Sequence, residues 1–119
     1  MSAKTYQATF STADYLPIDT WMCRCELSTE GKSLCDIRIL VTINTLRANA
    51  VSVDDRRGIS MLSVQYALET LPGRLEKEAP PKELRVPENF VRSPLSAQTE
   101  RVICDRLRQG ESFQIIVPH

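Results

Sequence analysis

The sequence predicts an α+β fold in two layers: an antiparallel sheet of about four strands with two helices on one face, in the order β-β-β-α-α-β. Apolar residues alternate with period two in the first third of the chain and are dense again near its end, as in strands. Two segments between these show helical periodicity. A length of 119 residues suits one domain, so we expect 1–119 to fold as a single unit.

Period-two alternation predicts three strands in the first part of the chain. They cover residues 5–11, 20–28 and 33–45, and each has one apolar face. The segment 11–19 carries two aspartates and a proline, which indicates a loop.

The turn between the second and third strands is predicted from its glycine. A three-residue loop at 29–31 places Gly31 where a left-handed residue is needed. In that register Cys25 faces Cys35 directly, and both apolar rows lie on one side of the sheet.

The middle of the chain predicts one helix and a long connector. Helical periodicity runs over 59–71 and is expected to stop at Pro72-Gly73, while 46–58 gives no clear pattern. Residues 72–93 hold prolines separated by charged residues, so we expect a Pro-rich, charged connector along the surface.

The last part of the chain predicts a helix followed by a strand. The helix is expected to open at Ser93-Pro94 and to close at Gly110, and residues 112–117 are apolar enough for a strand within the sheet. Four helix residues are expected in the core: Leu95, Val102, Ile103 and Leu107.

Composition excludes several classes of protein. The 15 Lys and Arg balance the 15 Asp and Glu, which argues against a partner held mainly through phosphate charge. No apolar run is long enough to cross a membrane. The first residues lack the apolar stretch of a signal peptide, so we expect a cytoplasmic protein that binds no membrane.

Catalytic patterns are absent from the sequence. The one histidine is His119, so a serine or cysteine nucleophile has no evident base. The four glycines are too dispersed for a phosphate loop, and the neighbours Asp54 and Asp55 are more typical of a helix start than of an acid–base pair. We therefore expect no enzyme, no cofactor and no metal site.

The four cysteines leave two interpretations open. Cys23, Cys25 and Cys35 share the apolar face of one hairpin, and Cys104 lies far along the chain. Their spacing matches no zinc-binding pattern, so reduced thiols in the core are favoured. The alternative is a thiolate metal or redox protein.

Arginine outnumbers lysine by eleven to four and supplies a second alternative. Arginines gather at 47–57 and in the helix that ends at Gly110, where they could contact nucleic acid. No aromatic residues are interleaved with them, and Arg101 is spaced to pair with Asp105 on a solvated helix face. A nucleic-acid-binding regulator is therefore kept only as an alternative.

The helix at 59–71 is the most informative segment. One apolar arc, enough to cover a sheet, consists of Met61, Val64, Ala67, Leu68 and Leu71. A second stripe is formed by Ile59, Leu62 and Tyr66. It must be covered by the connector, by the other helix or by another protein, and we predict these three residues as the partner-binding site.

The length, the α+β layout, the lack of catalytic residues and the two-sided helix at 60–71 resemble one known group. These features are similar to those of the small bacterial anti-activators of the QslA kind, which bind quorum-sensing transcription regulators. The resemblance implies a protein that masks the dimerisation surface of such a regulator, and it assigns no individual residues.

The expected function is therefore that of a non-catalytic regulator that binds another protein and acts by occupying its surface. An anti-activator that blocks the dimerisation of a transcription regulator is the narrower expectation. A homodimer of this chain is a further possibility.

Overall fold

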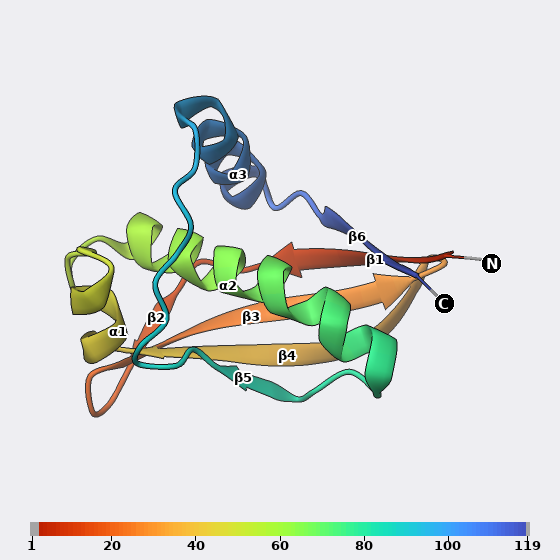
Figure 1. Cartoon of the computed structure of the whole chain (residues 1–119), viewed down its shortest axis with the longest axis horizontal. Coiled ribbons are helices and arrows are strands. Elements are labelled where there is room, and N and C mark those ends of the chain that lie inside the picture. Colours follow the sequence, from red (N-terminus) through yellow and green to blue (C-terminus); the bar gives the residue numbers. More distant parts are fainter. Residues whose placement is uncertain (1–2, 119) are drawn as a thin grey trace.

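A computed structural model describes residues 3–118 and shows one mixed sheet with a helical layer (Figure 1). The elements in chain order are β1 (Ala3–Phe10), β2 (Asp14–Leu16), β3 (Thr20–Thr29), β4 (Lys32–Thr42), α1 (Ile43–Ala48), α2 (Arg56–Lys77), β5 (Glu83–Arg85), α3 (Ala97–Gln109) and β6 (Phe113–Pro118). Within these residues no helix combines the length and the apolar character needed to cross a bilayer.

The α+β class is confirmed, but the sheet is larger than predicted. It has six strands in the order β5-β4-β3-β1-β6, with β2 also paired to β3. All pairs are antiparallel except β4 with β5, which is parallel. The two additional strands lie where the sequence indicated a loop and a connector. Each has only three residues, too few to show a period.

The hairpin between β3 and β4 has a tighter turn than predicted. Glu30 and Gly31 both have positive φ, at 52° and 76°, and form a two-residue turn between Thr29 and Lys32. A bulge follows, so Cys25 faces Ile37 and not Cys35. The predicted pairing is wrong by two residues, which leaves the apolar row on the same face.

The third predicted strand ends earlier than expected. β4 stops at Thr42, and the chain turns directly into α1, where Thr45 and Leu46 are fully buried. The backbone N–H of Ile43 donates to the carbonyl of Asp19 at 3.1 Å. This bond ties α1 to the loop between β2 and β3.

The central helix extends beyond both predicted ends. α2 runs from Arg56 through Pro72 and Gly73 to Lys77. Proline within a helix costs a hydrogen bond, but Leu71 and Leu75, one turn apart, are both buried in the core. Burial of these side chains keeps the last turns helical, so the predicted stop at Pro72-Gly73 is wrong.

The last helix starts later than predicted and ends where expected. Its N-cap is Ser96, whose hydroxyl accepts from the N–H of Thr99 at 3.1 Å, whereas Ser93 remains in the preceding segment. Gly110 closes the helix in the left-handed conformation. Ile103 and Leu107 are buried as predicted, but Val102 is 49% exposed.

The two long helices do not lie side by side on the sheet. α2 packs across the face of the sheet, while α3 packs against α2 and projects away from the strands (Figure 1). The expectation of two helices on one sheet face is therefore correct only for α2.

The connector is partly structured and covers α2. Leu84 and Val86 are buried in the core. After β5 the chain crosses α2 on its way to α3 (Figure 1). Asn49 holds this segment: its amide donates to the carbonyl of Phe90 and its oxygen accepts from the N–H of Arg92, both at 2.8 Å.

A buried serine joins α2 to the turn after β1. The hydroxyl of Ser60 accepts from the N–H of Ala13 at 2.8 Å and donates to the carbonyl of Arg56 at 2.7 Å. Ala13 and Ser60 are both fully buried, so no water replaces this contact.

Replacing Ser60 by Ala should lower the free energy of unfolding by about 1–3 kcal/mol, because the N–H of Ala13 would remain buried without an acceptor. Urea denaturation measures this loss. Ser63→Ala is the matched control: its hydroxyl donates to the carbonyl of Ile59, which belongs to a helical hydrogen-bond ladder in any case. An equal loss in both variants would contradict the proposed role of Ser60.

Candidate functional site

A cleft opens at the end of the molecule where the β2–β3 hairpin, α1 and the start of α2 meet. Its volume is about 450 Å³. It is lined by Tyr15, Asp19, Trp21, Ile43, Val53, Asp54, Arg56 and Ile59. In Figure 1 these elements lie at the left-hand end of the sheet.

One wall of the cleft is aromatic. Tyr15 and Trp21 face each other across the β2–β3 pair, and their rings meet edge to face with centroids 5.1 Å apart. Trp21 is buried, whereas Tyr15 is 56% exposed. The buried Trp21 therefore supports the Tyr15 ring, and the exposed part of Tyr15 is open to contact by another molecule.

The loop that follows this wall is strained. Ile18 and Asp19 have φ angles of 67° and 49°, and a β-branched residue rarely adopts a positive φ. The Thr20 hydroxyl donates to the carbonyl of Ile18 at 2.9 Å. The N–H of Ile43 at the start of α1 donates to the carbonyl of Asp19. These contacts hold the loop in a conformation that leaves Ile18 90% exposed.

The rim of the cleft carries both signs of charge. Asp19, Asp54 and Arg56 are exposed and line the opening. None of them takes part in the ion pairs found within residues 3–118. Their charged groups therefore remain available to a bound molecule.

The capping of α2 positions the charged rim. The Asp55 carboxylate accepts from the N–H of Gly58 at 2.9 Å. A Cβ at Gly58 would lie 2.5 Å from that carboxylate, so glycine leaves room for the cap. Asp54 and Arg56, the two neighbours of Asp55 in the chain, therefore lie at the capped start of the helix.

The predicted partner-binding residues lie elsewhere. Ile59 and Leu62 are fully buried by the chain itself, and Tyr66 is half-buried with its ring 5.0 Å from that of Phe90. The connector supplies Phe90, and Gln65 donates to the carbonyl of Ser93 at 2.8 Å beside it. Of the three predicted residues only Ile59 reaches the cleft, as part of its wall.

Cys23 and Cys25 occupy the core as the sequence predicted, whereas Cys35 and Cys104 are only partly buried at its margin. Cys23 and Cys25 are fully buried, and Cys35 is partly buried. Burial raises the pKa of the Cys23 thiol to about 11 and that of Cys25 to about 12. The same desolvation, with Asp36 nearby, raises the pKa of Cys35. Such thiols are poor nucleophiles and poor metal ligands at neutral pH.

No three His, Cys, Asp or Glu side chains in the described part of the chain come together where they could hold a metal ion. His119 lies outside the described residues.

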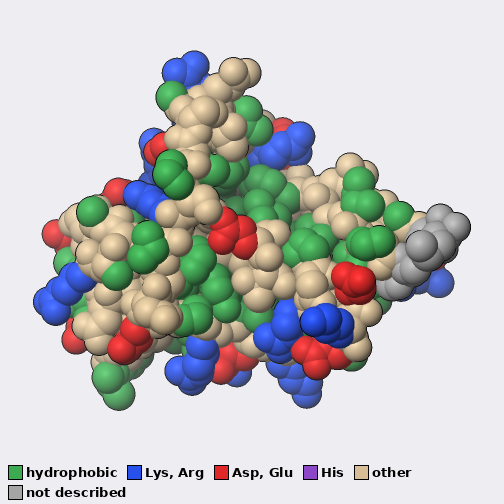
Figure 2. Space-filling view, viewed as in Figure 1, with side chains coloured by type: hydrophobic (Ala, Val, Ile, Leu, Met, Phe, Trp, Pro, Cys, Tyr) green, Lys and Arg blue, Asp and Glu red, His purple; other side chains and the backbone are tan. Residues whose placement is uncertain are grey.

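The arginines of α3 are largely paired. Asp105 binds Arg108 at 2.8 Å and not Arg101, and Arg106 lies 3.6 Å from Glu111. On the face shown in Figure 2, Lys and Arg side chains lie among Asp and Glu side chains and form no patch of one sign.

Sequence patterns missed the exposed residues around the cleft. Tyr15 and Ile18 belong to a segment predicted as a loop, and Val53 to one without a clear pattern. The available signal was the apolar content of Tyr15-Leu16 and Ile18 within an otherwise polar segment. A loop that only connects strands has no need of such residues.

No protein-family model, no curated protein and no solved structure matches this chain.

In the native protein, Cys23 and Cys25 should react slowly with iodoacetamide, and their rates should stay low between pH 7 and pH 9. The pKa values of about 11 and about 12 keep both thiols protonated over that range, and burial limits access. Mass spectrometry of the labelled peptides gives the rate at each site. The urea-unfolded chain is the control, and equal rates in the two states would contradict the core placement.

Proposed function

We propose that this protein is non-catalytic and acts by binding another protein at the cleft. The contact, named here the cleft surface, consists of Tyr15, Ile18 and Val53 with the lining of the cleft. The observation that carries the proposal is Ile18, a β-branched residue that is 90% exposed in a strained conformation. Strain of this kind is typical of functional sites.

Ile18 directly precedes Asp19, which lines the cleft, and two further exposed apolar residues belong to the same lining. Tyr15 is 56% and Val53 40% exposed, and both line the cleft beside Asp19. Exposed apolar residues gathered in one place usually mark a contact with another molecule. Aromatic and aliphatic anchors of this kind supply most of the binding energy in protein interfaces.

The chemistry of the cleft defines what the partner presents. An apolar side chain would fill the space between the aromatic wall and Val53. Asp19 and Asp54 outnumber Arg56 at the rim, which favours a basic group beside that side chain. A short segment with an apolar anchor next to a lysine or arginine meets both requirements.

The contact is placed at the cleft and not on α2, because Ile59 and Leu62 are covered by the chain itself. The exposed face that a partner requires is instead supplied by the hairpin and by the segment before α2.

The narrower proposal is that the partner is a cytoplasmic transcription regulator and that binding blocks its dimerisation. It is supported by the resemblance in length, α+β layout and lack of catalytic residues to the QslA kind of anti-activator. A rigid apolar loop that inserts into a partner's surface suits an inhibitor that acts by covering the surface through which the partner would dimerise.

A photo-crosslinking amino acid at position 18 should capture a specific protein in cells that express the chain natively. The same group at position 34 is the control, because Leu34 is also exposed but lies far from the cleft on β4. Val53→Arg should abolish capture at position 18, since it places a charge in the apolar surface. Mass spectrometry identifies the captured protein.

Equal capture at both positions, or capture that survives Val53→Arg, would contradict the cleft surface as the contact. The purified partner then tests the narrower proposal: size measurement should show its dimer dissociating when the chain is added. A DNA-binding regulator that remains dimeric in the complex would contradict dimerisation blocking.

A further inference from the structure

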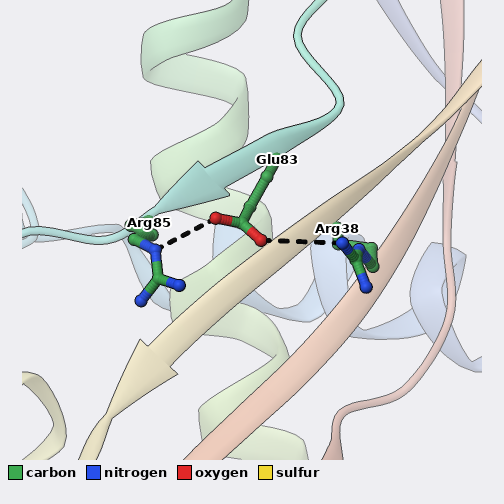
Figure 3. Close-up of polar contacts among 3 residues, drawn as sticks. All are labelled: Arg38, Glu83 and Arg85. Carbon is green, nitrogen blue, oxygen red and sulfur yellow. Dashed lines mark hydrogen bonds and ion pairs between the residues drawn. The ribbon is translucent and has the colours of Figure 1, made fainter.

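The two edges of the sheet differ in length and charge. The β5 edge has only three residues, and Glu83 on it lies between two arginines (Figure 3). Its carboxylate is 3.0 Å from Arg85 and 3.8 Å from Arg38. A short, charged edge is a common protection against pairing with another strand.

The opposite edge, β6, lacks this protection. Its six residues, Phe-Gln-Ile-Ile-Val-Pro, carry no charge. β6 pairs with β1 on one side, and no strand of the described chain pairs with its other side. Ile116 on this strand is 59% exposed.

The position of its proline shows which residues of β6 are hydrogen-bonded to β1 and which direct their backbone groups outward. Pro118 has no N–H, so its pair with Ala3 cannot exchange two hydrogen bonds. Alternation then makes Val117 and Ile115 the residues bonded to β1, whereas Gln114 and Ile116 direct their backbone groups outward.

A second contact gives the same assignment of bonded and outward-facing residues. The N–H of Ser11 donates to the carbonyl of Arg24 at 2.9 Å, so odd-numbered residues of β1 direct their backbone groups toward β3. Even-numbered residues of β1, such as Tyr6, therefore bond to β6, and Tyr6 faces Ile115. The free edge thus presents two N–H groups, those of Gln114 and Ile116. It also presents three carbonyl groups, those of Gln114, Ile116 and Pro118.

We propose that β6 is a dimerisation edge, at which two copies of this chain pair antiparallel about a two-fold axis beside Ile116. In this register each Ile116 N–H donates to the carbonyl of Ile116 in the second copy. Each Gln114 N–H donates to the carbonyl of Pro118 in the second copy. Every free donor finds an acceptor, and the missing N–H of Pro118 leaves no donor unpaired.

A second copy fits this edge because β6 carries no charged side chain that would repel another β6. No like charges meet across the axis, and the two exposed Ile116 side chains become neighbours on the open face. Lys4 on the adjacent strand does not meet the Ile116 pair, because its ammonium lies on the helix side of the sheet, 5.3 Å from the centre of the Tyr6 ring. The dimer would continue one sheet through both copies.

Sedimentation over a range of concentrations tests the dimer. The unmodified chain should pass from monomer to dimer as its concentration rises. Ile116→Pro removes the central donor but keeps the bonds to β1, because proline is tolerated where the N–H faces outward. Ile116→Lys places two like charges side by side at the axis. Each variant should raise the dissociation constant about tenfold or more.

Val102→Lys on α3 is the matched control, since it replaces another exposed apolar residue and should leave the dimer unchanged. Circular dichroism confirms the fold of each variant, and if Ile116→Pro does not fold, Ile116→Lys decides. A chain that stays monomeric, a dimer that survives a folded Ile116 variant, or association that continues beyond the dimer would each overturn the proposal.

Discussion

The structure depends on the burial of α2 on both sides. Both apolar rows of the helix are buried, the arc with Val64, Ala67 and Leu71 as well as the stripe with Ile59 and Leu62. A helix enclosed in this way cannot carry charged residues along most of its length, which explains why none occurs between Gly58 and Glu69. Small polar residues replace them: Ser60 accepts a bond from the turn after β1, and Gln65 binds the connector.

This enclosure also explains the irregular parts of the fold. Asn49 is buried and binds the segment at Phe90 and Arg92, which holds the connector against the helix layer. α1 replaces the end of the predicted third strand because Thr45 and Leu46 turn into the core beside that segment. The loop at Ile18 is in turn held by α1, so its conformation depends on the same packing.

The sequence predicted those features that local chemistry decides. Alternating runs located β1, β3 and β4, apolar density located β6, and Gly110 located the end of α3. Features set by tertiary contacts were not accessible in the same way. Pro72 does not end α2 because Leu71 and Leu75 are buried, and a bulge shifts the partner of Cys25 without changing its face. Periodicity located the stripe on α2 but could not show what covers it.

The cleft shows the same limit more strongly. It combines Tyr15, Val53 and Ile59 from distant parts of the chain, and only the folded chain brings them together. The positive φ of Ile18 has no signal in the residue type, since isoleucine disfavours it. The sequence pattern indicated an apolar surface on the helix, where Ile59 and Leu62 are buried, whereas Tyr15 and Val53 at the cleft are exposed.

The thermal midpoint of two arginine variants of the isolated chain tests most directly whether α2 is core and the loop is surface. Leu62→Arg should unfold the chain or lower the midpoint by about 10 °C or more, because an unpaired buried charge costs several kcal/mol. Ile18→Arg should leave the midpoint nearly unchanged, because that side chain already faces water. A Leu62→Arg variant as stable as the parent chain would contradict this account and return the contact surface to α2.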